Sequence, residues 1–129
     1  MSASPSLHTL HLPDGLDVYA PDGSEIRFLA AGTRGSMVHC RLPPGSVSAA
    51  VVHRTVEELW YFIAGEGQVW RKRGEVEQIE DVRPGASLNI PTGTHFQFRC
   101  TGAQPLDFVI VTMPPWPGAD EAVPVLGCW

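Results

Sequence analysis

The chain has 129 residues, enough for one domain with a single core, and its 43% hydrophobic and 18% charged content is typical of a globular protein. Its formal net charge of −5 argues against nucleic acids and anionic membrane surfaces as partners, because both attract positively charged proteins. Segment 1–13 lacks the features of a signal peptide, and no apolar run reaches the roughly 18 residues of a membrane span. The three cysteines show no CxxC spacing, which favours a cytoplasmic location.

Short apolar segments recur at intervals of about ten residues and are separated by proline and glycine turns, a rhythm typical of an all-β sandwich or barrel. No stretch shows a sustained helical period. The expected strands are Ile26–Ala31, Met37–Leu42, Ser46–His53, Glu58–Ala64, Gln68–Lys72, Glu77–Val82, Ser87–Ile90, Phe96–Thr101 and Leu106–Met113. They predict a single all-β domain over residues 1–129, whose barrel core spans about 26–113.

The expected strand Glu58–Ala64 is largely apolar on both of its faces. Alternation places Trp60 and Phe62 on the same face as Glu58, and the other apolar side chains on the opposite face, namely Leu59, Tyr61 and Ile63. One face belongs to the barrel interior. Because the other also needs cover, from a partner subunit or from the chain's own tail, we expect a homodimer.

Two sequence blocks carry the strongest signal. The first runs His53-Arg-Thr-Val-Glu-Glu58-Leu-Trp60-Tyr-Phe62-Ile-Ala-Gly65-Glu-Gly67, and the second runs Gly85-Ala-Ser-Leu-Asn-Ile-Pro91-Thr-Gly93-Thr-His95-Phe96-Gln-Phe98. Together they resemble the two characteristic blocks of the cupin superfamily, and longer phrases resemble its small bacterial single-domain members. The resemblance covers roughly residues 45–101 and implies a jelly-roll antiparallel β-barrel with its functional cavity inside.

In metal-dependent cupins, three histidines and a glutamate converge on an ion, and this chain matches only part of that set. By the resemblance, His53 takes the place of the second histidine and Glu58 that of the glutamate, whereas Val51 and Phe96 replace the other two histidines. His95 comes one residue early, so it should point out of the barrel or lie at its rim unless a bent strand end turns it inward. We therefore expect no cofactor. The alternative is a divalent transition metal (iron, manganese, zinc or nickel) held by His53, Glu58 and His95.

His53 and Glu58 are the expected catalytic residues. Burying either one alone would be costly, so we expect each to satisfy the other's hydrogen bonds. One interpretation is a pair inherited without a chemical role. The other is an acid–base dyad, in which the carboxylate holds the tautomer of the imidazole and raises its basicity.

The side chains expected around this pair, and so in contact with a substrate, are mostly aromatic. Trp60 and Phe96 flank the ligand positions and are the expected stacking surfaces. The remaining expected contacts are Val51, Phe62, Phe98 and His95, although core filling is the favoured interpretation of Phe62 and Phe98. Aromatic walls around one buried polar pair suit a small, mostly apolar organic molecule.

The C-terminal segment 114–129 is too rich in proline for regular structure to be expected. It nevertheless carries several large apolar side chains, Trp116, Val123, Val125, Leu126 and Trp129, which a disordered tail rarely does. We expect it to pack on the barrel or on a partner subunit. Closure over the cavity mouth is the alternative.

Three functions remain open from the sequence. The preferred one is a metal-independent acid–base enzyme, an isomerase, cyclase or lyase, that uses His53 and Glu58 on a small apolar substrate. The second is a metal-dependent, dioxygenase-like cupin that uses His53, Glu58 and possibly His95. The third is a non-catalytic module that binds a small ligand, and analogy at the level of the fold does not choose among them.

Overall fold

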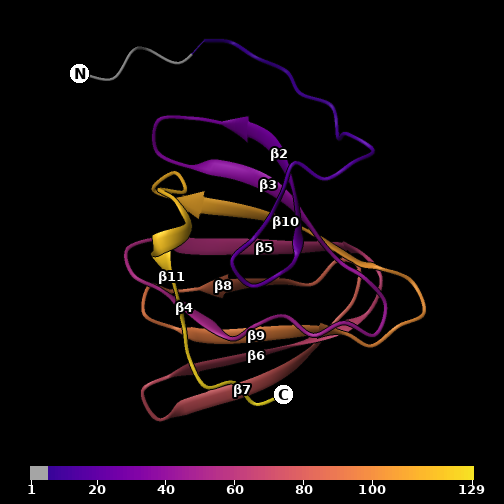
Figure 1. Ribbon diagram of the computed structural model, residues 1–129, viewed down its shortest axis with the longest axis vertical. Coiled ribbons are helices and arrows are strands. Elements are labelled where there is room, and N and C mark those ends of the chain that lie inside the picture. Colours follow the sequence, from indigo (N-terminus) through magenta and orange to yellow (C-terminus); the bar gives the residue numbers. More distant parts are fainter. Residues whose placement is uncertain (1–5) are drawn as a thin grey trace.

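The computed structural model describes residues 6–129. Residues 1–5 belong to segment 1–13, for which no signal peptide is expected, and they lie outside the described residues. Two antiparallel sheets enclose one core, which confirms the predicted all-β jelly-roll barrel (Figure 1). The first sheet has the order β1-β2-β3-β10-β5-β8 and the second the order β11-β4-β9-β6-β7. Among residues 6–129, no helix has both the length and the apolar character needed to cross a membrane.

The strands of the first sheet are β1 (Val18–Tyr19), β2 (Glu25–Ala31), β3 (Ser36–Leu42), β10 (Leu106–Met113), β5 (Glu57–Ala64) and β8 (Ser87–Ile90). Those of the second sheet are β11 (Ala122–Pro124), β4 (Val51–His53), β9 (His95–Cys100), β6 (Gly67–Arg73) and β7 (Val76–Val82). Most of the expected strands lie where the sequence predicts them, with ends that differ by one residue at most. The short strands β1 and β11 were not expected.

The expected strand Ser46–His53 is wrong over its first part, because β4 contains only Val51–His53. The preceding residues do run beside β9. There, however, the hydroxyl of Ser48 accepts a hydrogen bond from the backbone N–H of Phe98, at 3.0 Å. The serine hydroxyl thus accepts the hydrogen bond that a backbone carbonyl would accept in a regular pair of strands. The alternation of apolar residues in the sequence does not reveal this competition between a side chain and the backbone.

Trp60 lies at the centre of the aromatic core between the sheets. Its ring centroid lies 4.7 Å from Phe108, 5.4 Å from both Phe96 and Phe98, and 6.2 Å from Phe62. Most of these contacts are edge-to-face or tilted, geometries that add about 0.5–1.5 kcal/mol per pair beyond the burial of apolar area. The cluster therefore gives the cavity beside it a rigid wall.

The turn between β5 and β6 requires the two glycines of the first block. Gly65 has a φ of +80°, and a Cβ at this position would overlap the carbonyl oxygen of Pro105. A Cβ on Gly67 would overlap the carbonyl oxygen of Arg99. The glycines thus allow the chain to pass tightly against the start of β10, which pairs with β5 so that Thr112 lies opposite Glu58.

The C-terminal segment contains regular structure, contrary to expectation. After a short 3-10 turn, Ala119–Glu121, strand β11 pairs with β4 so that Ala122 lies opposite His53. A strand containing Pro124 is possible here because β11 is at the edge of its sheet. Figure 1 shows this segment in yellow, running from β11 across the second sheet.

Two polar side chains fasten the C-terminal segment to the barrel. The carboxylate of Glu121 accepts hydrogen bonds from the backbone N–H groups of Thr55 and Val56 and from the Thr55 hydroxyl. Further along, the Gln97 side-chain oxygen accepts the N–H groups of Cys128 and Trp129, at 3.0 and 3.1 Å. The segment is therefore part of the folded domain.

Replacing Glu121 by alanine is expected to lower the free energy of unfolding by roughly 2 kcal/mol, because it removes a charged acceptor from three buried or half-buried donors. Urea denaturation measures this loss. Asp120→Ala is the matched control, since Asp120 is the exposed neighbour in the same turn and should change stability by less than about 0.5 kcal/mol. Equal losses in the two variants would show that the Glu121 contacts do not fasten the segment.

Candidate functional site

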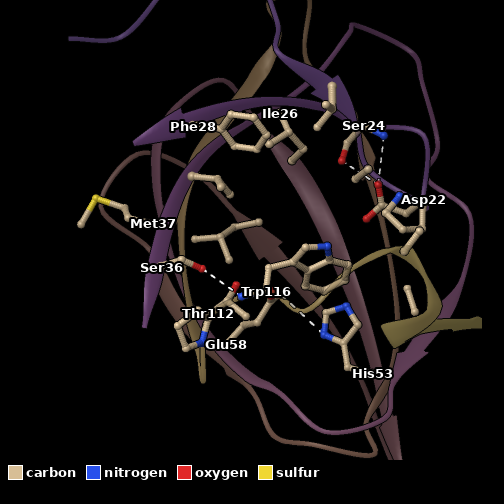
Figure 2. A pocket seen from close by; sticks show the side chains of 18 of the residues that line it. Asp22, Ser24, Ile26, Phe28, Ser36, Met37, His53, Glu58, Thr112 and Trp116 are labelled. Atoms are coloured by element: carbon tan, nitrogen blue, oxygen red, sulfur yellow. Dashed lines mark hydrogen bonds and ion pairs between the residues drawn. The ribbon is translucent and has the colours of Figure 1, made fainter. Parts of the chain in front are cut away.

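A cavity of about 770 Å³ lies inside the barrel, between the first sheet and the C-terminal segment. Its walls are mostly apolar side chains from β2, β3, β5 and β10, closed on one side by Pro115 and Trp116. Besides Tyr19, whose side chain is largely exposed, the polar side chains that reach it are few: Asp22, Ser24, Ser36, His53, Glu58 and Thr112 (Figure 2). A mostly apolar cavity with a few converging polar groups is the usual form of a small-molecule site.

The structure brings five of the expected site residues together at this cavity: Val51, His53, Glu58, Trp60 and Phe96. Three others do not line it. Phe62 and Phe98 lie in the core behind the wall, with their ring centroids 4.6 and 5.3 Å from that of Phe108. His95 is partly exposed and lies outside the cavity, because one residue of offset from Phe96 turns its side chain to the other face of β9.

Glu58 is a carboxyl group held in place on β5 by two donors. The hydroxyl of Thr112 donates to Oε2 at 2.6 Å, and the indole Nε1 of Trp60 donates to Oε1 at 3.1 Å. The residue is only 5% exposed. Burial raises the pKa of Glu58 to about 7, although the two hydrogen bonds pull it partly back. At neutral pH the group therefore exists in both its protonated and ionised forms.

His53, on β4, lies beside Glu58 without a hydrogen bond to it. The distance from His53 Nδ1 to Glu58 Oε1 is 3.9 Å, and Nδ1 is buried without a hydrogen-bond partner among residues 6–129. The imidazole is packed edge-on against Phe96 and Trp116, at centroid distances of 5.0 and 5.2 Å. Burial lowers the pKa of His53 to about 4, although the nearby Glu121 carboxylate opposes the shift.

These contacts correct the expected dyad in two respects. His53 and Glu58 do not satisfy each other's hydrogen bonds, and the carboxylate does not raise the basicity of the imidazole. The reason is that Trp60 and Thr112 already occupy the oxygens of Glu58, while apolar rings surround His53. The group that titrates near neutral pH is consequently Glu58, and His53 is a neutral imidazole.

The donor set does not fit a transition metal. Val51 and Phe96 face the same cavity as His53 and Glu58 but offer no ligand atom, and His95 lies outside it. Within the described part of the chain, no three His, Cys, Asp or Glu side chains are grouped closely enough to hold a metal ion. One imidazole and one carboxylate fall short of the three protein ligands that such sites ordinarily use.

The sequence reasoning did not name several polar or aromatic groups of the site, although closure of the cavity mouth by the C-terminal segment was one of its alternatives. Thr112 comes from β10, and Trp116 from the C-terminal segment, where its backbone N–H donates to the Ser36 hydroxyl at 3.2 Å. Asp22 and Ser24 come from the turn before β2, in which Asp22 Oδ1 accepts the N–H and hydroxyl of Ser24, at 2.9 and 2.6 Å. In sequence, Asp-Gly-Ser indicates only a turn.

The two shifted pKa values predict opposite effects of pH on stability. Glu58 holds its proton more tightly in the folded state, so its contribution to stability falls as pH rises from 4.5, its ordinary pKa, to about 7. His53 holds its proton less tightly in the folded state, so its contribution rises between about pH 4 and its ordinary pKa of 6.5. The two contributions therefore oppose each other between these limits in the wild-type protein.

Single variants should separate the two contributions. In Glu58→Gln, the His53 contribution remains, and the free energy of unfolding should rise by roughly 2 kcal/mol from pH 4.5 to 6.5. In His53→Gln, the free energy of unfolding should fall by a similar amount over the same pH range. Urea denaturation at several pH values measures both slopes relative to the wild-type slope, because His39 and Asp22, whose pKa values burial also shifts, contribute equally to all three proteins. Slopes that depart from the wild-type slope in the same direction in the two variants would contradict the assignment.

Comparison with known proteins adds the family to this description. Residues 38–112 match the family of the cupin domain. An uncharacterized protein of Methanocaldococcus jannaschii is 28% identical over 107 residues, which cover 79% of this chain and 82% of that protein. Among solved structures, BH2720 from Bacillus halodurans has a TM-score of 0.66 at 22% identity, over 72% of each chain.

Oxalate decarboxylase from Bacillus subtilis is also similar, with a TM-score of 0.76 at 17% identity. The match covers 96% of this chain but 33% of that enzyme. At these identities the solved structures show a shared fold and nothing about a shared reaction.

Proposed function

The chain belongs to the cupin domain family, and on that premise we propose that its cavity binds a small, mostly apolar organic molecule on which Glu58 transfers a proton without a metal. The observation that supports the proposal most strongly is the state of Glu58. A buried carboxyl group on the cavity wall, with a pKa of about 7, can both accept and donate a proton at neutral pH. Isomerases, cyclases and lyases that act without a metal rely on general acid–base groups, and a carboxyl group with a pKa near 7 can serve as one.

The arrangement suits proton transfer next to a carbonyl group. Ionised Glu58 accepts a proton from the carbon beside the carbonyl: the C–H bond breaks, an O–H bond forms on Glu58, and the electron pair moves to the carbonyl oxygen. In the tautomer with a proton on Nδ1, His53 can donate a hydrogen bond to that oxygen, since Nδ1 has no other partner in the described chain. In a β,γ-unsaturated carbonyl compound, Glu58 then returns the proton to the γ carbon: its O–H bond breaks, a C–H bond forms, the electron pair moves back from the oxygen, and the carbon–carbon double bond shifts next to the carbonyl, which completes an isomerisation.

The walls favour this chemistry by excluding water. Trp60, Phe96 and Trp116 surround the two polar residues, so the reacting carbon of a bound molecule is kept away from most bulk water. Trp60 and Thr112 also fix the carboxyl group in one position, and a fixed catalytic group is more effective than a mobile one.

A non-catalytic binding module is the second candidate. Both oxygens of Glu58 already accept hydrogen bonds within the protein, so the residue is satisfied without a substrate. In such a module Glu58 and His53 would orient a ligand that leaves chemically unchanged.

Hydrogen–deuterium exchange on carbon distinguishes the two candidates. The protein is incubated in D₂O with a panel of small aromatic and aliphatic carbonyl compounds, and deuterium incorporation is followed by mass spectrometry. Proton transfer predicts deuterium on the carbon next to the carbonyl of at least one compound that binds. Compounds that bind in the cavity but incorporate no deuterium above the rate without protein would favour the binding module.

Two further expectations stay predictions. On the outward face of β5, Leu59, Tyr61 and Ile63 are 52%, 52% and 44% exposed, which fits a surface covered by a second copy of the chain. Size-exclusion chromatography with light scattering tests the homodimer, and a monomer at micromolar concentration would argue against it. The cytoplasmic location likewise remains an expectation from the cysteine content.

A further inference from the structure

The cavity contains a second carboxyl group, Asp22, at a distance from Glu58. Figure 2 shows Asp22 and Ser24 on one side of the cavity, and Glu58 with Thr112 on another. Both hydrogen bonds from Ser24 go to Oδ1 of Asp22, at 2.6 and 2.9 Å, so neither occupies Oδ2. Asp22 is thus held in place while retaining the capacity to bind a donor from a ligand.

The rest of the cavity offers no cationic side chain to an anionic ligand. Most of the other side chains that line the cavity are apolar, among them Ile26, Val38 and Ile110. No lysine or arginine lines the cavity in the part of the chain that the structure describes. A carboxylate or phosphate entering this space would lose its hydration without gaining a cationic partner, whereas an ammonium group would gain one at Asp22.

The third observation is the unsatisfied nitrogen of His53. His53 is 5% exposed, lines the cavity, and has no hydrogen-bond partner for Nδ1 among residues 6–129. A buried polar atom without a partner is uncommon, and a polar group of a ligand in the cavity would supply the missing partner of Nδ1. The cavity therefore has polar positions for a ligand at two of its sides, within a mostly apolar lining.

We infer that the cavity prefers a mostly apolar organic amine, whose ammonium group binds Asp22 and whose body extends toward Glu58 and His53. This inference rests on the proposed function and names the class of its substrate. The ammonium group would be fixed at the Asp22 side, and the reacting carbon would lie at the Glu58 side. An acid of the same shape would be excluded by charge.

Three probes of the same shape test the inference on the wild-type protein: 3-phenylpropylamine, 3-phenylpropan-1-ol and 3-phenylpropanoate, each titrated by calorimetry at one ionic strength. The amine is expected to bind at least about ten times more tightly than the alcohol, and the acid most weakly. Asp22→Asn should bring the affinity for the amine to within about twofold of that for the alcohol, and leave the alcohol unchanged. Asp81→Asn is the control, because Asp81 lies on β7 and does not line the cavity.

A second measurement does not depend on how well the Asp22 variant folds. In the wild-type complex, intermolecular NOEs should connect the methylene beside the amine nitrogen with Ser24 and Ala20, which line the Asp22 side of the cavity. Equal affinities of the amine and the alcohol, tighter binding of the acid, or no binding of any probe at millimolar concentration would overturn the inference. The proposed function does not depend on these results, because it is tested separately by deuterium incorporation into a neutral carbonyl compound.

Discussion

Replacing Glu58 by glutamine is expected to reduce deuterium incorporation into a substrate by roughly 10²–10⁴-fold, the usual contribution of a general acid–base group. Glutamine keeps the shape of the side chain, and its oxygen can still accept a hydrogen bond, but the amide cannot take up the substrate proton. Initial rates by mass spectrometry measure the loss. Binding of the same compound, measured in parallel, should change far less.

Glu57→Gln is the matched control for this experiment. Glu57 is the neighbouring residue on the same strand, and it is exposed on the opposite face, away from the cavity. Its replacement should leave the rate within about twofold of wild type. A Glu58→Gln variant with an undiminished rate would show that another group takes the proton.

Restoring the two missing histidines should create a metal site where the wild-type chain lacks one. Val51 and Phe96 pair directly across β4 and β9, and both face the cavity that contains His53 and Glu58. The double variant Val51→His with Phe96→His would therefore present three imidazoles and one carboxylate. Its affinity for Zn²⁺ should exceed that of the wild-type protein by roughly 10³-fold or more.

Calorimetry with a competing chelator measures both affinities, and the two single variants are the controls, each expected to gain less than the double variant. The account is contradicted if the double variant binds zinc no more tightly than wild type. It is also contradicted if the wild-type protein already holds a stoichiometric, tightly bound ion at His53 and Glu58.

The sequence predicts the fold well because the barrel depends on local signals. Alternation places Glu58 and Trp60 on the inner face of β5. Gly65 and Gly67 form the following turn, where a Cβ would overlap the backbone of Pro105 or Arg99. A one-residue offset likewise distinguishes Phe96, which lines the cavity, from His95, which does not. The faces of these strand residues follow from near neighbours in sequence, and the turn is recognised from Gly65 and Gly67 themselves.

The parts of the site that were missed depend on contacts between distant segments. Thr112 donates to Glu58 across 54 positions of sequence, and Trp116 reaches Ser36 across 80. Neither threonine nor tryptophan in an apolar segment indicates a site by itself. Asp22 was missed because a turn sequence does not reveal which way its side chain points.

The state of His53 could not be predicted from the sequence for a physical reason. A spacing of five residues between His53 and Glu58 suggests a pair, but a hydrogen bond requires a separation near 3 Å, and the structure has 3.9 Å. The difference decides which group titrates near neutral pH, because an unpaired imidazole among aromatic rings loses its proton more readily. Only the packing of Phe96 and Trp116 around the ring reveals this.

Direct titration of Glu58 tests the central claim. Carbon-13 NMR of the glutamate side-chain carboxyl groups, with the Glu58 signal assigned by its loss in Glu58→Gln, should give a pKa of about 7. A pKa close to 4.5, the ordinary value, would mean that Glu58 is ionised throughout the neutral range, and it could then not donate a proton there. That result would contradict metal-free proton transfer by this residue.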